Sequence, residues 1–275
     1  MSEPAARRRP APAVIGAWLI IGLFVLVAIV GPLVTADPAR HTASPLLPIG
    51  ADRHPLGTDD LGRDQLARMV CGARPLLLVS VTATAVAAIL GIGAGLAAGY
   101  AGGRIDWLLT AATDVALTFP TMLLTILIVA AWRPGAAGLV AGIGVTLAPG
   151  LTRLARVLTA AEATREYVAA ARSAGARASR ILVREILPNI AGPMLAQVVM
   201  TLSIAAGFAA GLSYLGLGIQ PPTPDWGYMA HAGQEFLYTA PRLVTLPAAA
   251  SLLFVVACNL AGDGLRDAVD PRRDR

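Results

Sequence analysis

The sequence predicts an all-α polytopic membrane protein with six transmembrane helices and with both termini in the cytoplasm. Hydrophobic residues make up 56% of the 275 positions and charged residues only 14%, a balance typical of membrane proteins. Six apolar stretches approach the roughly 20 residues that a helix needs to cross the hydrocarbon core. Arginines cluster on one side of these stretches, which fixes an orientation.

The composition also excludes several classes of enzyme. All 22 basic residues are arginine, so the chain has no lysine for a phosphate-binding P-loop or for a pyridoxal Schiff base. It also lacks the HExxH, GxSxG and CxxC motifs. We therefore expect a subunit without catalytic residues, cofactor or metal site. The net charge of +5 is an orientation signal here and does not indicate nucleic-acid binding.

The expected spans are residues 14–34, 76–101, 108–132, 136–151, 190–217 and 243–261. Three arginines precede the first span, so a signal peptide is the alternative reading there. The stretch is longer than a usual signal-peptide core, and residues 35–38 make a poor cleavage site, which favours a retained helix.

Arginine asymmetry places the N-terminus inside. With that orientation 15 arginines are cytoplasmic and seven are external, and the opposite orientation reverses the bias. The domain organisation is then a cytoplasmic tail (1–13), a first transmembrane helix (14–35), an external segment (36–74), a core transmembrane domain (75–262) and a C-terminal cytoplasmic tail (263–275).

Two external segments follow from this topology. In the first, apolar residues recur at helical spacing over 66–73 and predict an interfacial helix, capped by Thr58 or Asp59, before the chain turns at Pro75. The second, residues 219–242, contains Asp225, Trp226 and Tyr228. Its aromatic residues suit a membrane-interface belt, and the alternative is a rim that contacts a substrate-delivery protein.

Small residues and prolines mark the spans. Glycines spaced four residues apart favour close helix contact; they are Gly91, Gly95 and Gly99, then Gly138 and Gly142, then Gly207 and Gly211. Prolines at 120, 149 and 247 permit kinks.

A few polar residues lie in or near the spans. Asp114 lies inside the third span, where we expect a structural pair with Arg153 ahead of a role in transport. His231 and Glu235 stand one turn apart, which is a weak metal signal. Cys71 and Cys258 are expected on opposite sides of the membrane and therefore unpaired.

Residues 153–188 form the one large cytoplasmic loop. Apolar positions from Arg153 onward predict a helix that Gly175 ends in a left-handed conformation. A second short helix through Ile181 then leads to Pro188 at the start of the next span.

This loop resembles the cytoplasmic loop by which permeases of ATP-binding-cassette importers couple to their ATPase subunits. The family pattern is Glu-Ala-Ala, three residues, Gly, and a Leu-Pro about twelve residues later. The matching positions are Ala170, Ala171, Gly175, Leu187 and Pro188, whereas Ala169 stands where the family has Glu. We expect Glu166 or Glu162 to supply that charge instead.

Other segments resemble the second permease of dipeptide and oligopeptide importers, a group that includes nickel and glutathione importers. They are residues 54–64 (HPLGTDDLGRD), 72–74 (GAR), 98–103 (AGYAGG), 215–222 (LGLGIQPP) and 262–271 (GDGLRDAVDP). The resemblance runs from about residue 14 to residue 273.

The resemblance implies a type I importer permease fold with a cytoplasmic coupling helix, in the cytoplasmic membrane. It implies a heterodimer with a second homologous permease, two ATP-binding subunits and an external substrate-binding protein. Peptides are the expected substrate, and nickel chelates, glutathione or haem are alternatives. Three other functions are alternatives: an ion-coupled secondary transporter, an exporter permease, and a structural or receptor subunit. The sparse buried charge disfavours the secondary transporter.

Overall fold

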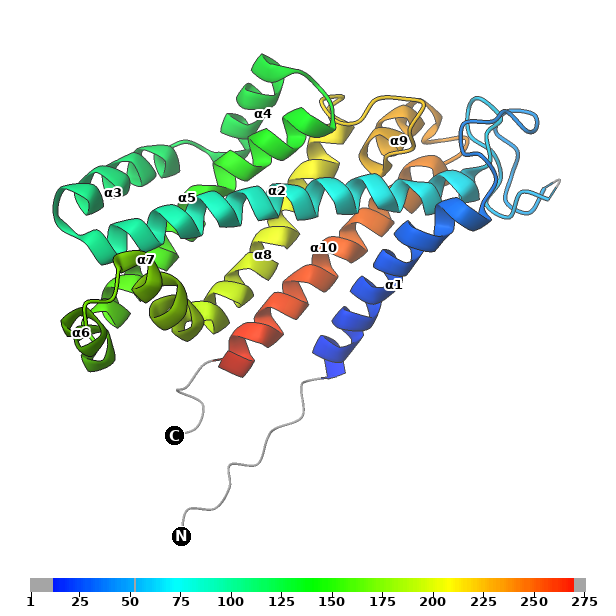
Figure 1. The fold of residues 1–275 in the computed structure, drawn as a ribbon. Helices are drawn as coiled ribbons and strands as arrows, with labels where there is room; N and C mark the ends of the chain where they lie inside the picture. Colours follow the sequence, from blue (N-terminus) through cyan, green and yellow to red (C-terminus); the bar gives the residue numbers. More distant parts are fainter. Residues whose placement is uncertain (1–11, 52, 270–275) are drawn as a thin grey trace, which may run out of the picture.

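The computed structural model describes residues 12–51 and 53–269, and in this range it is built from helices and loops (Figure 1). Of the predicted cytoplasmic arginines, those at positions 7, 8, 9, 272, 273 and 275 lie outside the described residues. The helix order is α1 (Pro12–Val34), α2 (Gln65–Ala101), α3 (Gly103–Thr118), α4 (Thr121–Trp132), α5 (Ala136–Ala163), α6 (Glu166–Ser173), α7 (Ala178–Arg180), η1 (Ile181–Ile186), α8 (Leu187–Tyr214), α9 (Trp226–Ala232), η2 (Gly233–Phe236) and α10 (Arg242–Val269). The all-α fold class is thus confirmed.

Five helical segments within the described residues are long and apolar enough to span a membrane. They are Pro12–Val34, Gln65–Ala101, Ala136–Ala163, Ala178–Tyr214 and Arg242–Ala268. A sixth crossing arises if α3 and α4 count as one span. The start of α1 and the end of α10 lie at the same end of the bundle, as an even number of crossings requires (Figure 1).

The third predicted span, 108–132, is not one straight helix. It breaks at Phe119 and Pro120, and α3 and α4 meet there at an angle of 92°. Proline lacks the N–H that would continue the ladder, and it disfavours helical geometry in the residue before it. Phe119 accordingly has extended backbone, with φ of −82° and ψ of 137°.

The separate interfacial helix predicted before Pro75 is wrong. Helix α2 runs without a break from Gln65 through Pro75 to Ala101. Its N-cap is Asp64, whose carboxylate accepts the Ala67 N–H at 2.9 Å, and neither Thr58 nor Asp59 holds that position. Pro75 is buried, so packing against neighbouring helices offsets the hydrogen bond that it removes.

Two of the three glycine series have the predicted packing role. Along α2, Gly91, Gly95 and Gly99 face α5 so closely that a Cβ on Gly95 would lie 2.6 Å from the carbonyl oxygen of Thr152. Gly142 similarly brings α5 against Val129 of α4, where the Thr125 and Thr146 hydroxyls share a buried 2.8 Å hydrogen bond.

The third glycine series does not pack in this way. A Cβ on Gly207 or Gly211 of α8 would meet no atom nearer than 3.6 Å, so that prediction is wrong within this chain.

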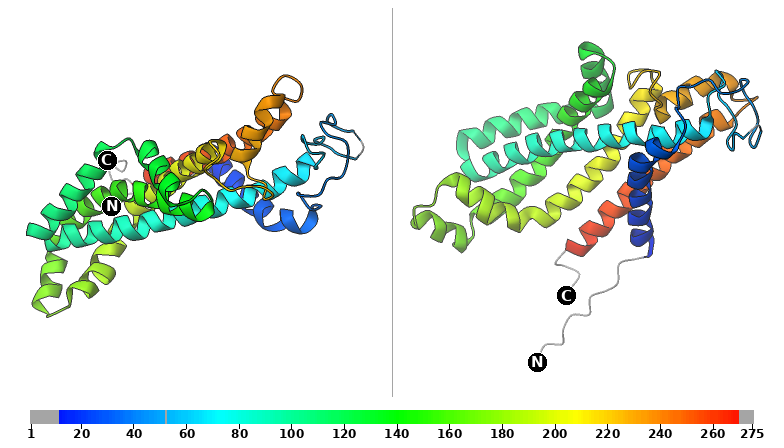
Figure 2. Two further views of the ribbon diagram at one scale, coloured as in Figure 1. Left: turned by 90° about the horizontal axis from the view of Figure 1, so that it is seen from above. Right: turned by 45° about the vertical axis from the view of Figure 1, so that its right-hand side comes forward.

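Two apolar clusters form the interior. The larger one joins α1, α2, α4, α5, α8, α9 and α10, and its aromatic centre is Phe24, which lies 5.4 Å from Phe254 and 5.6 Å from Trp226 between ring centroids. The smaller one lies at the other end and joins α2 and α5 to α6, η1 and α8 through Val168, Ile181 and Ile186. Figure 2 shows α6 and α7 projecting at the far end from the long loop before α2. The smaller cluster therefore anchors the loop over residues 153–188, which resembles the coupling loop of importer permeases.

Candidate functional site

The predicted helix over 153–175 is two helices. Helix α5 continues beyond Arg153 to Ala163, and α6 begins at Glu166 after a break at Thr164 and Arg165. Glu166 in the first turn and Arg172 in the last turn of α6 both suit the helix dipole. The segment that resembles a coupling helix is thus an eight-residue helix separate from the spans.

Gly175 ends α6 as the sequence predicts. Its φ is +78°, a conformation that glycine adopts without steric cost. The Gly175 N–H donates to the carbonyl of Arg172 at 3.0 Å, and the Ala176 N–H donates to that of Ala171 at 3.1 Å. These two bonds form a Schellman motif, which satisfies carbonyls that the helix end leaves free.

The predicted site residues of α6 fall on two faces. Glu166, Ala169 and Ala170 are exposed and, at about 100° per residue, share one side of the helix. Val168 is fully buried on the opposite side, and Ala171 packs beside it in the smaller apolar cluster. The exposed side, which we call the docking face, is therefore made by Glu166, Ala169 and Ala170, while Ala171 serves packing.

The remaining predicted residues lie at the start of α8. Leu187 packs against the smaller cluster, and Pro188 is exposed in the first turn of the helix. Glu162, the alternative to Glu166, is already engaged: its carboxylate accepts the Tyr167 hydroxyl at 2.6 Å and lies 3.7 Å from Arg165. Glu166 is thus the better placed of the two carboxylates to meet a partner.

A positively charged hollow begins at Gly175, directly after the end of α6. It has a volume of about 590 Å³ and is lined by Gly175, Ala176 and Ser179, by Val183, and by Arg177, Arg180 and Arg184. The three arginines are exposed at helical spacing: Arg177 is the N-cap of α7, Arg180 ends α7, and Arg184 lies in η1. Their spacing was visible in the sequence, but only the turn at Gly175 shows that they line one hollow.

Two ion pairs fasten α3 to α5 near this site. Asp114 accepts from Arg153 at 2.7 Å, which confirms the predicted structural pair. Both side chains are more than half exposed, so this pair contributes little stability. Asp106 makes a second, two-bonded contact with Arg156, one turn further along α5. Of the two pairs, the less exposed Asp106–Arg156 pair is the stronger link between α3 and α5.

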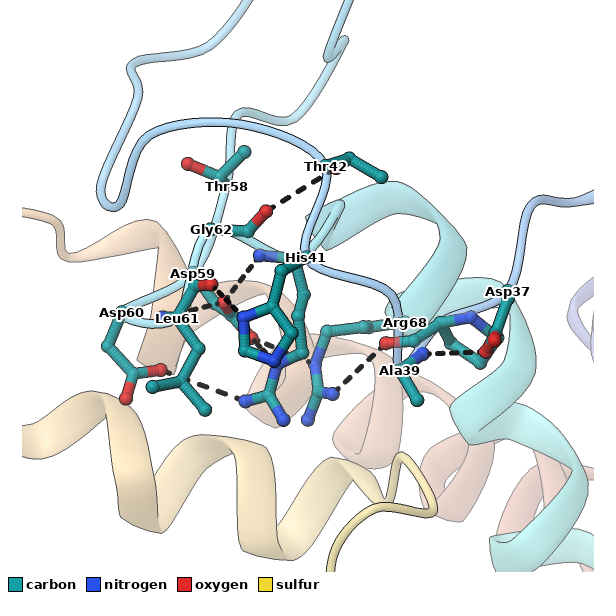
Figure 3. A network of polar contacts seen from close by, with 12 residues as sticks. Asp37, Ala39, His41, Thr42, Thr58, Asp59, Asp60, Leu61, Gly62 and Arg68 are labelled. Carbon is teal, nitrogen blue, oxygen red and sulfur yellow. Dashed lines mark hydrogen bonds and ion pairs between the residues drawn. The ribbon is translucent and has the colours of Figure 1, made fainter.

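The opposite end of the molecule carries a folded loop over residues 36–64. Its centre is Asp59, which lies 2.6 Å from Nε of Arg63 and 3.2 Å from Nε of Arg68 (Figure 3). Asp59 and Arg68 are each about 5% exposed or less, so the charges compensate each other away from water. Arg242 of α10 donates to the carbonyls of Leu47, Leu56 and Thr58. The loop is therefore fixed to both α2 and α10.

The second external segment is built differently from the prediction. Asp225 is 5% exposed and caps α9 by accepting the Tyr228 N–H at 3.0 Å. Trp226 is 3% exposed, and its indole N–H donates to the carbonyl of Met69 at 2.8 Å. These two side chains hold α9 against α2 and offer almost no surface to another protein. Of the three predicted contact residues, only the half-buried Tyr228 has accessible surface.

We expect Asp225→Ala to destabilise the protein by about 1 kcal/mol, the usual contribution of an N-cap. Asp225→Asn keeps a capping oxygen and is the matched control. Burial raises the pKa of Asp225, so its ionisation costs more in the folded than in the unfolded protein. The wild-type protein should then lose stability as pH rises from the ordinary carboxyl pKa towards the raised value, and Asp225→Asn should lose this dependence.

Thermal unfolding in detergent between about pH 4 and 7 measures both effects. An Asp225→Ala variant as stable as the wild type would refute the capping role.

The structure does not support a metal site at His231 and Glu235. The ring of His231 lies against Tyr214 and Tyr228, with centroids 5.9 and 6.0 Å away. Across residues 12–51 and 53–269 no three His, Cys, Asp or Glu side chains gather as metal ligands. Cys71 and Cys258 are both buried and free, as predicted.

Comparison with known proteins gives a consistent result. Residues 91–275 match the family model described as "Binding-protein-dependent transport system inner membrane component". The di/tripeptide transport system permease protein DppC of Pseudomonas aeruginosa is 39% identical over 265 residues, which is 94% of this chain and 88% of that protein. The glutathione transport system permease protein GsiD of Pectobacterium atrosepticum is 38% identical over 219 residues, which is 80% and 73% of the two chains.

A solved structure shares the fold. It is a chain of the MetNI methionine ABC transporter in an inward-facing conformation, with a TM-score of 0.59 and 17% identity. The match covers 74% of the present chain and 98% of the other.

Proposed function

The chain belongs to the family of binding-protein-dependent transport system inner membrane components, and from this membership we propose that it carries di- or oligopeptides across the cytoplasmic membrane as the permease subunit of an ATP-binding-cassette importer. The observation that supports the substrate class most strongly is the 39% identity with a di/tripeptide permease over 94% of the chain. The exposed docking face on α6 supports the coupling role.

We propose a complex of four kinds of subunit. This chain pairs with a second, homologous permease, and the substrate pathway lies between the two. Two ATP-binding subunits lie on the side of α6 and hydrolyse ATP, while a substrate-binding protein delivers cargo at the end that carries α9 and the loop over residues 36–64. The permease itself contributes no catalytic group.

The docking face suggests how ATP binding and hydrolysis on the ATPases are transmitted to the permease. Ala169 and Ala170 carry small side chains, so a groove on an ATPase can approach the α6 backbone closely. Closure of the ATPases on ATP would then displace α6 and open the pathway outward, and hydrolysis would reset it inward. Such a shift requires that α6 contact the ATPase differently in the two states. Glu166 and the arginines of the adjoining hollow supply charged partners for that contact.

Glutathione is the second candidate substrate, because a glutathione permease is 38% identical over 80% of the chain. Glutathione is itself a small peptide, so a pathway suited to di- or oligopeptides would also suit glutathione. Nickel chelates and haem remain the more distant alternatives.

Reconstitution in liposomes tests the function. The complete transporter and its binding protein are assembled, and ATP-driven uptake of a labelled dipeptide is measured with glutathione, a nickel chelate and haem as competitors. We expect uptake that needs ATP and the binding protein and that excess dipeptide suppresses. Suppression by glutathione alone would favour the second candidate, and uptake driven by an ion gradient without ATP would refute the proposal.

A further inference from the structure

Helix α6 has little apolar anchorage of its own. It is eight residues long, too short to be stable in isolation, and Val168 is its one fully buried side chain within the part of the chain described. Val168 sits among Ile181 and Ile186, which keeps the helix at its place on the bundle. Val168 and the small, half-buried Ala171 beside it fix the position of α6 but resist rotation about the helix axis only weakly. Polar contacts must therefore set the direction of the docking face.

The first such contact is made by Tyr167. Its hydroxyl donates to Glu162 of α5 at 2.6 Å and accepts from the side-chain amide of Asn189 of α8 at 3.2 Å. The Asn189 amide also donates to the carbonyl of Glu185 at 2.6 Å, which holds it in place. One phenol thus links α6 to the end of α5 and to the start of α8. These are the long helices that come before and after the segment of α6, α7 and η1 in the chain (Figure 1).

The second contact is made by Arg172, one turn after Val168. Its guanidinium carbon lies 4.6 Å from the centre of the Tyr100 ring, and its Nε donates to the Tyr100 hydroxyl at 3.3 Å. Tyr100 is in the last turn of α2, which packs along α5 through the glycine series. Arg172 therefore joins the far end of α6 to a third helix.

We propose that Tyr167 and Arg172 are positioning residues that fix the rotation of α6 relative to α2, α5 and α8, so that a displacement of the docking face moves these three helices together. The inference rests on the proposed importer function. At about 100° per residue Tyr167 and Arg172 lie on opposite flanks of the docking face, and each contacts other helices of this chain, so we infer that they act through the orientation of α6.

The main test is Tyr167→Phe in the reconstituted transporter, which removes the linking hydroxyl and keeps the ring. We expect the ATPase subunits to bind and hydrolyse ATP, while the substrate imported per ATP falls about fivefold or more. Tyr214→Phe, at the other end of α8, is the matched control and should leave this ratio unchanged. A Tyr167→Phe transporter with the wild-type ratio would overturn the proposal, whereas a wild-type transporter without ATP-driven uptake would instead overturn the importer function.

Conservative variants separate positioning from general packing. Tyr100→Phe keeps the ring beneath the Arg172 guanidinium and should retain most of the coupling, whereas Tyr100→Leu should lose it. Equal loss in both variants would contradict the role of the ring.

A distance measurement tests the rotation directly and does not depend on transport. Spin labels at the exposed Ser173 of α6 and Val157 of α5 report how well α6 is held. We expect one narrow distance distribution in the otherwise wild-type protein and a broadened one with Tyr167→Phe. An unchanged distribution would show that the hydroxyl does not orient the helix.

Discussion

Gly175→Glu is expected to abolish transport-coupled ATP hydrolysis while the permease remains folded. A Cβ on Gly175 would have no heavy atom within 4 Å, so the substitution creates no clash inside the chain. The positive φ costs a non-glycine residue about 1–2 kcal/mol, which a folded membrane protein tolerates. The long anionic side chain would, however, project beside the docking face and into the arginine-lined hollow. Substrate-stimulated ATP hydrolysis in liposomes is the measurement.

The control for this prediction is Gly50→Glu. Gly50 has a φ of +80° and equally open surroundings, but it lies in the loop at the opposite end of the molecule. It therefore carries the same backbone strain without touching the docking region. Normal substrate-stimulated hydrolysis by the Gly175→Glu transporter would count against α6 as the coupling element.

Gly95→Leu is expected to prevent the protein from folding. A Cβ at this position would lie 2.6 Å from the carbonyl oxygen of Thr152 and 2.8 Å from the amide of Arg156, which are backbone atoms that cannot rotate away. Relief requires α2 and α5 to separate, and their contact extends along both helices through Gly91 and Gly99. Overpacking of a side chain typically costs 1–3 kcal/mol, and forcing two backbones apart costs more. The readout is the yield of monodisperse protein in detergent and its thermal unfolding.

Gly93→Leu is the matched control. Gly93 lies two residues away on the same helix, is exposed, and has no heavy atom within 4 Å of a built Cβ. It should give normal yield, because a leucine there meets lipid. If both variants fold equally well, close packing of α2 on α5 is not what holds the bundle together.

Hydrophobicity was sufficient to predict the helical class, because spans of about 20 apolar residues have few other stable solutions in a membrane. It was insufficient at the helix ends. Helix α2 extends 11 residues before the predicted span, from Gln65 rather than 76, because buried contacts with α9 carry it through Pro75. Helix α5 likewise continues past the charged Arg153. Local hydropathy cannot report such tertiary support.

The break at Pro120 shows a different limit. The sequence indicates that a hydrogen bond is lost there, but the 92° angle depends on how α4 packs against α5. Packing through Gly142 and Thr146 of α5, set by residues more than 20 positions away, determines where α4 goes.

The candidate site likewise has some residues that the sequence could predict and others that it could not. Gly175 and the small residues before it could be found by motif and by turn chemistry, since a left-handed residue after a helix favours glycine. Tyr167 and Arg172 carry no such signal, because their partners Asn189 and Tyr100 lie 22 and 72 positions away. The prediction for Asp225 and Trp226 misjudged their surroundings, since aromatic residues near an interface occur both in contact surfaces and in buried wedges.

Site-directed cross-linking at Ala170 tests the central claim most directly. The native Cys71 and Cys258 are buried, so a thiol-specific cross-linker should react mainly with a cysteine introduced on the surface. With Ala170→Cys in membranes that contain the assembled transporter, we predict a covalent product with an ATP-binding subunit. The control Tyr238→Cys, 98% exposed at the opposite end, should give no such product. A cross-link to the ATPase from Tyr238→Cys, or none from Ala170→Cys in a transporter that imports substrate, would contradict the account.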